Sequence, residues 1–181
     1  MAFNKKPAFA KSTFITMILL IVFTGRSFSQ SNEYLVKAAY IEKFARFTEW
    51  PARALEGKFI IAILGKDPFN GALKDIAGKE KIKGLPVEVQ IINDISELGR
   101  CHILFIAKER GNSLNQILSH LGSRHILTVS DSKDYSEKGV HFNFYFTDKS
   151  TIHFEVNPSS LKKSGLNTDM YLLQFGKKVG G

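Results

Sequence analysis

Cys101-His102-Ile103-Leu104-Phe105-Ile106-Ala107 is a nearly continuous apolar run, with Gly99 before it and the polar segment 108–111 after it. A strand with one wet face alternates apolar and polar residues, whereas a strand covered on both faces is apolar throughout. The run therefore predicts a central strand in a sheet that carries helices on both faces.

The segments on either side of the run alternate between strand and helix patterns. Strands are predicted at Lys58–Leu64, Leu85–Ile92 and His125–Ser130, and helices at Glu33–Thr48, Asn70–Ile76 and Ser113–Leu121. This rhythm is typical of α/β folds, in which crossover helices connect parallel strands. In the first helix, the apolar spacing places Lys37, Glu42, Lys43 and Arg46 on the solvent side.

The rhythm changes after Ser130. Val140–Thr147 and Thr151–Asn157 alternate in polarity and are joined by a three-residue loop, which predicts a β-hairpin. Helices are expected at Ser159–Ser164 and Met170–Lys178. The predicted fold class is thus a single α/β domain, with a mixed, mostly parallel sheet flanked by helices, a C-terminal β-hairpin and terminal helices.

The first 29 residues have the pattern of a secretory signal peptide. Lys5, Lys6 and Lys11 form a positive start, and the apolar stretch Phe14–Phe23 has about ten residues, within the range of about 7–15 for a signal core. Cleavage is expected after Ser29. The alternative, a transmembrane anchor, needs about 20 apolar residues, and Gly25-Arg26 ends this stretch earlier. We expect an exported protein with one domain, residues 30–181.

Charge and cysteine content narrow the function classes further. The formal net charge is +8, but four of these positive charges lie in residues 1–29, which contain no acid, so the rest of the chain has +4. That mild, dispersed charge does not indicate nucleic-acid binding. Cys101 is the only cysteine, so no internal disulfide is possible. Because it opens an apolar strand, it is expected to be a buried, unreactive thiol.

The predicted hairpin carries the most informative polar pattern. Its apolar face has Val140, Phe142, Phe144 and Phe146, with Ile152, Phe154 and Val156 beside them. The other face has His141, Asn143, Tyr145, His153, Glu155 and Asn157. The register places Tyr145 opposite His153 and Asn143 opposite Glu155. Three interpretations stay open: a solvated face, a surface for a small ligand or partner, and a metal site formed by two imidazoles and a carboxylate.

Other candidate chemistry is weaker. Gly65–Ala72 has the wrong glycine spacing for a phosphate loop, and Ala72 stands where that motif needs lysine. The segment still follows a predicted strand, at the edge where open α/β sheets bind ligands. Ser130 and Asp131 with a histidine would make a triad only on paper, because no serine lies in a Gly-x-Ser-x-Gly turn. We expect no catalytic residues, no metal and no cofactor.

The ordered set of segments resembles the YfiR family. The segments are Ala38–Pro51 (AAYIEKFARFTEWP), Phe59–Pro68 (FIIAILGKDP), Cys101–Ile106, Leu127–Asp131 (LTVSD), Phe154–Asn157 (FEVN), Ser164–Leu166 and Leu172–Gln174. The resemblance implies a periplasmic, non-enzymatic α/β protein that is often dimeric. Family cysteines used for redox control would fall near Ala62, Ser136 and Asn143, so only Cys101 is matched and an internal redox switch is not expected.

The resemblance also implies a regulatory function. Better-known members repress a membrane-bound diguanylate cyclase by binding its periplasmic domain, and relatives occur beside sensor kinases. The expected partner is therefore the periplasmic domain of such an inner-membrane protein, with a homodimer as a further possibility. An alternative is a periplasmic sensor that binds a small ligand or metal. The residues expected to bind a partner or ligand are His141, Tyr145, His153, Glu155, Asn157, Leu173 and Gln174.

Overall fold

A computed structural model describes residues 32–180 of the chain. The predicted signal peptide, residues 1–29, lies outside these residues. The first described element is a helix at 32–47, which agrees with the predicted Glu33–Thr48 to within one residue at each end. Among the helices within 32–180, none combines the length and the apolarity that crossing a membrane requires.

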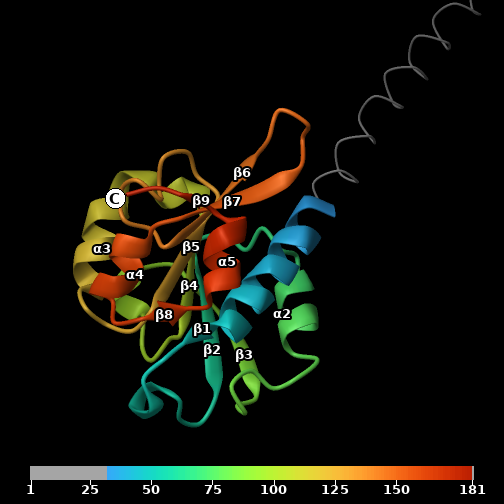
Figure 1. The fold of residues 1–181 in the computed structure, drawn as a ribbon. Coiled ribbons are helices and arrows are strands. Elements are labelled where there is room, and N and C mark those ends of the chain that lie inside the picture. The colour runs from blue at the N-terminus through green and yellow to red at the C-terminus, as the bar shows by residue number, and fades with distance from the viewer. Residues whose placement is uncertain (1–31, 181) are drawn as a thin grey trace, which may run out of the picture.

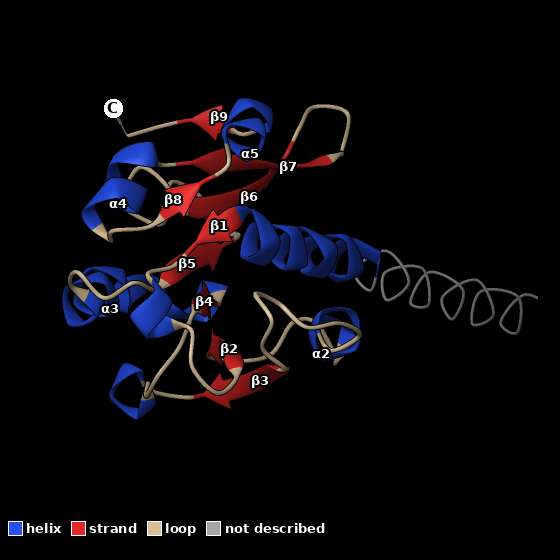
Figure 2. Ribbon diagram, turned by 60° about the horizontal axis from the view of Figure 1, so that its bottom comes forward, coloured by secondary structure: helices blue, strands red, loops and turns tan. Residues whose placement is uncertain are grey.

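Seven strands form the main sheet, in the order β3-β2-β4-β5-β6-β7-β9 (Figures 1 and 2). Strands β2 to β6 are all parallel to one another, whereas β7 runs antiparallel to β6 and β9 runs parallel to β7. The predicted mixed, mostly parallel sheet is confirmed. The strands are β2 Phe59–Leu64, β3 Val87–Ile92, β4 Ile103–Ile106, β5 Leu127–Ser130, β6 Phe142–Phe146, β7 Ile152–Val156 and β9 Lys177–Lys178.

Helices cover both faces of the sheet. The helix at 32–47 and α2 lie on one side and α3 lies on the other, as Figure 2 shows. A second, two-stranded sheet pairs β1 with β8 and ties the end of the first helix to the C-terminal region. The remaining elements are α2 Ala72–Ala77, α3 Leu114–Leu121, α4 Pro158–Lys163, α5 Met170–Phe175, β1 Thr48–Glu49, β8 Asn167–Thr168, and the 3-10 helices Ala52–Ala54, Ile95–Glu97 and Lys108–Ser113.

Strand β4 is buried along its whole length, as its sequence predicts. Ile103 and Phe105 belong to the apolar cluster under the helix at 32–47 and α2. Leu104 and Ile106 belong to a second cluster under α3. Alternate residues of the strand therefore enter two separate cores, which is why Ile103–Ile106 contain no polar position.

The C-terminal region differs from the prediction in two places. The predicted helix Met170–Lys178 ends at Phe175, because Gly176 leaves the helix and Lys177–Lys178 add a strand beside β7. A side chain at position 176 would lie 2.6 Å from the ring of Phe154, so glycine allows this close approach. Phe146, predicted to be in the core, is 53% exposed because the hairpin extends beyond the body of the protein (Figure 1).

Candidate functional site

The sheet has a switch in strand order at its carboxyl edge. Strand β2 is flanked by β3 on one side and by β4 on the other, so the loops that leave β2 and β4 diverge. In open α/β sheets, ligands bind in the crevice at such a point. The loop Gly65–Gly71 after β2 and the 3-10 helix Lys108–Ser113 after β4 flank this crevice.

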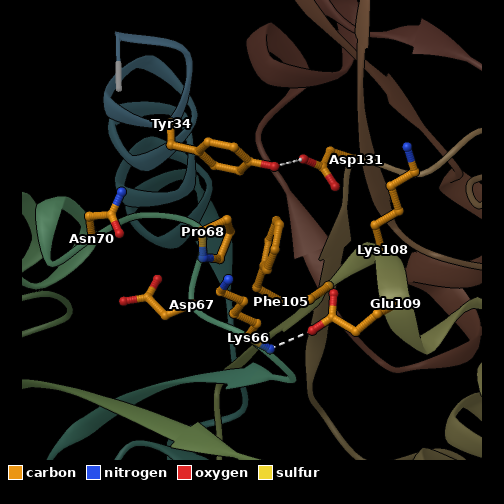
Figure 3. A pocket seen from close by; sticks show the side chains of 10 residues that line it. Tyr34, Lys66, Asp67, Pro68, Asn70, Phe105, Lys108, Glu109 and Asp131 are labelled. Carbon is orange, nitrogen blue, oxygen red and sulfur yellow. Dashed lines mark hydrogen bonds between the residues drawn. The ribbon is translucent and has the colours of Figure 1, made fainter. Parts of the chain in front are cut away.

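A pocket of about 380 Å³ lies at this point and is called the switch-point pocket here (Figure 3). Its apolar part comes from Tyr34, Pro68 and Phe105. The polar groups on its wall belong to Lys66, Asp67, Asn70, Lys108, Glu109 and Asp131. The sequence placed the segment 65–72 at a ligand-binding edge of the sheet, and this segment lines the pocket.

Gly65 and Glu109 hold the two loops of the switch-point pocket together. The Glu109 carboxylate accepts a hydrogen bond from the Lys66 backbone N–H (Figure 3). Gly65 has a φ of +105°, and a Cβ at this position would lie 2.5 Å from Glu109 Oε1. Position 65 therefore requires glycine for its conformation and for space. Glu109 thus occupies one of the backbone N–H donors that a phosphate loop would direct at its ligand.

A partly buried ionic cluster lies at the edge of the switch-point pocket, which Tyr34 and Asp131 line. Lys37 Nζ lies 2.6 Å from Asp131 Oδ2 and also contacts the Glu33 carboxylate. Tyr34 donates its hydroxyl to the same Asp131 oxygen at 2.8 Å. Burial, reinforced by this carboxylate, raises the pKa of Tyr34 well above its usual value. Glu33, Tyr34, Lys37 and Asp131 are called the ionic cluster here.

The prediction that Lys37 faces solvent is wrong. Its side chain is only 3% exposed. The helical spacing places Lys37 beside Tyr34, Ala38 and Ile41, which pack in the core or against it. Its charge is accommodated there because Asp131, the first residue after strand β5, forms an ion pair with it. The sequence patterns did not predict that Tyr34, Lys37 and Asp131 lie together. The one sequence feature that pointed to them was the carboxylate of Asp131, directly after a buried strand.

The polar face of the hairpin is not uniformly solvated, so that interpretation is wrong for His141, Asn143 and Asn157, which are buried. The predicted register is confirmed, with Tyr145 opposite His153 and Asn143 opposite Glu155. The Asn157 side chain caps α4 by accepting from the Ser160 N–H, and it donates to the Ser136 carbonyl. In this position the Asn157 side chain fixes the start of α4.

His141 is also engaged within the fold. Its Nδ1 accepts from the Thr128 backbone N–H at 2.9 Å, and its Nε2 lies 2.9 Å from the Ser164 hydroxyl. Burial lowers the pKa of His141 to about 4. Tyr145, His153 and Glu155 remain on the accessible side, and Glu155 pairs with Lys177 of β9 at 3.1 Å. The structure thus brings these three together and separates them from His141 and Asn157.

The two C-terminal candidates lie on α5. Gln174 is exposed, whereas Leu173 packs partly against the core. Around them, large apolar side chains are solvent-exposed: Phe47, Met170, Tyr171 and Phe175. These four residues are called the apolar surface here. A groove of about 240 Å³ runs between the helix at 32–47 and α5, bordered by Tyr40, Phe47, Tyr171 and Phe175. Composition alone gave no indication of this surface.

The candidate reactive groups are engaged within the fold. Ser130 donates its hydroxyl to the Ile106 carbonyl at 2.8 Å, inside the sheet. Cys101 is buried in the same apolar cluster as Ala62, and burial raises its pKa to about 12. Within residues 32–180, no group of three His, Cys, Asp or Glu side chains is arranged to hold a metal ion.

The strand order and the pocket at the switch point define a doubly wound α/β protein that carries an additional antiparallel hairpin. The chain belongs to the YfiR/HmsC-like family, whose model matches residues 34–177. This confirms the resemblance inferred from the ordered segments. The match covers every element from the first helix to the start of β9.

Comparison with solved structures gives a similar fold at low sequence identity. One match is the ABC domain from Streptococcus pneumonia, solved in complex with L-Trp, with a TM-score of 0.51 and 13% identity. The match covers 67% of this chain and 55% of that one, so this chain spans about half the length of that structure. At this identity the similarity shows the fold alone. No curated protein matches this chain.

Proposed function

We propose that this chain is an exported regulator that represses an inner-membrane signalling protein, a diguanylate cyclase or a sensor kinase, by binding its periplasmic part. The observation that carries the proposal is the family match over residues 34–177. Residues 1–29 act as the signal peptide, so the working location is the periplasm. The chain acts by binding and not by turnover, consistent with the engagement of Ser130 and Cys101 inside the sheet.

The apolar surface is the proposed contact with the partner. Tyr171 is 72% exposed and Phe175 is 75% exposed, and they lie on α5 beside the exposed Gln174. Soluble proteins rarely expose grouped aromatic side chains without a partner. Aromatic residues are also enriched among those that dominate binding energy at interfaces. Binding to one state of the partner and not to the other would shift its equilibrium toward the repressed state.

Deletion and complementation in the native host test this proposal. Deletion of the gene should raise cyclic-di-GMP or the output of a kinase reporter, and the wild-type gene should restore it. Phe175→Glu should fail to restore repression, because it places a charge in the contact. Ile91→Glu is the matched control, since Ile91 is 56% exposed on the opposite edge strand β3, and it should restore repression. Unchanged outputs after deletion would refute the proposal.

A second candidate is a periplasmic sensor that uses the accessible part of the hairpin. Tyr145 and His153 face each other there, with ring centroids 6.2 Å apart, and Glu155 lies on the same strand as His153. Binding of a metal or small molecule would raise the melting temperature, and the double variant His153→Ala with Glu155→Ala would abolish that rise. A thermal shift that persists in the double variant would place the ligand elsewhere.

A further inference from the structure

We propose that a second pocket, between the helix at 32–47 and the hairpin, binds a small molecule through a primary ammonium group. This hairpin pocket has a volume of about 610 Å³. It shares Tyr34, Lys108 and Asp131 with the switch-point pocket, so the two pockets adjoin at the ionic cluster. The site does not depend on the partner contact proposed above, because α5 contributes nothing to its wall.

The ionic cluster carries one more negative charge than positive. Glu33 and Asp131 share a single cation, Lys37, which contacts both. The exposed fraction is 3% for the side chain of Lys37, 8% for that of Asp131 and 23% for that of Glu33. An uncompensated charge is costly where water is excluded. Lys108 and Lys133 also line the hairpin pocket but form no ion pair with the cluster, so a cation bound at Asp131 would complete its neutralisation.

Two acceptors on residues that line this pocket have no donor among residues 32–180. Both hydrogen bonds of Asp131 go to Oδ2, so Oδ1 accepts none from residues 32–180. Asn143 is 2% exposed, and its Oδ1 also has no donor within the described part of the chain. A buried acceptor left unpaired costs about 1–3 kcal/mol. An ammonium group has three N–H donors and no acceptor, which matches a carboxylate and an amide oxygen.

The walls of the hairpin pocket favour an organic cation over an inorganic one. Phe144, Tyr145 and Phe146 supply aromatic rings, and Lys37 Nζ already lies 4.3 Å from the Tyr34 ring centroid. Aromatic faces attract ammonium groups. The other charged residues on the wall are Lys108, Lys133, Asp134 and Glu155, and Glu155 is paired with Lys177. Lys108 and Lys133 form no ion pair within residues 32–180, so they are available to a ligand carboxylate.

The shared chemistry is therefore a primary ammonium, from either a diamine or an amino carboxylate. Titration calorimetry and thermal shift on the protein made from its full chain compare putrescine, γ-aminobutyrate and butanediol, which have the same four-carbon backbone. Putrescine or γ-aminobutyrate should bind saturably, and butanediol should not. Tighter binding of γ-aminobutyrate would identify the zwitterion as the source, through Lys108 and Lys133.

Asn143→Leu separates a ligand site from a structural polar group. Because the Asn143 amide oxygen has no partner to lose, this variant should fold at least as stably as wild type. It should weaken amine binding roughly tenfold or more. Asn115→Leu, an exposed position on α3, is the matched control and should bind as wild type does. Equal binding by Asn143→Leu, or an equal shift with sodium chloride, would overturn the proposal, as would no amine binding at all.

Discussion

The His141 cluster and the ionic cluster, both within residues 32–180, differ in whether their hydrogen bonds are complete. In the His141 cluster, the Thr128 backbone N–H donates to His141 Nδ1. The Thr128 hydroxyl accepts from the His141 backbone N–H at 3.0 Å. Nδ1 is thus the acceptor, so Nε2 carries the proton and donates it to the Ser164 hydroxyl. In the ionic cluster, two carboxylates share Lys37, and the Asn143 amide oxygen, on the wall of the same pocket, has no donor within residues 32–180.

This difference separates a cluster that serves the fold from one that can serve a ligand. Every ring nitrogen of His141 is used within the protein, so the cluster joins β5, β6 and the end of α4 and has nothing left to bind. The ionic cluster retains acceptors and a negative charge beside a pocket. Buried polar groups in native proteins are nearly always paired, so the exceptions indicate sites of function.

Removal of Lys37 should have the largest effect. Lys37→Met keeps the length of the side chain but leaves Asp131 and Glu33 without their shared cation. Breaking a buried ion pair on one side typically costs about 3–5 kcal/mol in the free energy of unfolding. Urea denaturation measures the loss. The control is Lys43→Met, an exposed lysine on the same helix, which should change stability by less than about 0.5 kcal/mol.

Adding a ligand to the Lys37→Met variant tests whether the ionic cluster, unlike the His141 cluster, can bind a cation. If the cluster binds an ammonium group, putrescine should recover part of the stability lost in Lys37→Met, since it would replace the missing cation. A loss below about 1 kcal/mol would mean that solvent reaches the cluster and that the contrast with His141 is wrong.

Acid should destabilise the His141 cluster. The folded pKa is lowered to about 4 by burial, so the neutral ring is the native form, whereas the unfolded chain takes up a proton near the ordinary value of 6.5. The contribution of His141 to the free energy of unfolding is constant above pH 6.5. It declines as the pH falls from 6.5 toward 4, by up to about 3 kcal/mol in total. Unfolding curves across that range for wild type and His141→Gln measure it. The slope for His141→Gln should be smaller, and parallel slopes would contradict the prediction.

Substitution of Tyr34, which donates a hydrogen bond to Asp131 of the ionic cluster, should lower the free energy of unfolding by a smaller amount. Tyr34→Phe removes the hydroxyl that donates to Asp131 while Lys37 continues to neutralise the carboxylate. The loss should be about 1–2 kcal/mol, since one charged hydrogen bond of a partly buried group disappears. Tyr171→Phe on α5, where the ring is 72% exposed, is the control and should be neutral in the same urea titration.

Periodicity was sufficient to predict the body of the fold. The nearly continuous apolar run 101–107 predicted a strand buried on both faces, and the alternation in the hairpin predicted its register, because both patterns follow directly from which face is covered. The β1–β8 pairing and β9 were missed. Each has two residues and forms through contacts distant in sequence, which local patterns do not encode.

The candidate site was only partly predictable for a related reason. The segment 65–72 was placed at a ligand-binding edge because it follows a strand. The ionic cluster joins Lys37 to Asp131 across 94 positions, and a lysine in an amphipathic helix ordinarily faces water. Likewise, the polar face of the hairpin was taken as one surface, but packing of α4 against its base divides it between buried His141 and accessible His153.

Oxidation or reduction at Cys101 should change the stability and binding of the protein least of all. Its thiol is buried, donates to the Ile103 carbonyl at 2.8 Å, and has a pKa raised to about 12, so the reactive thiolate is scarce at neutral pH. Oxidant and reductant should leave the melting temperature and any amine or partner binding unchanged. Maleimide should label the chain in urea but not in its native state. Labelling of the native protein would mean that β4 opens at its start, and the neighbouring core would then be a mobile region and not the rigid base on which the two polar clusters rest.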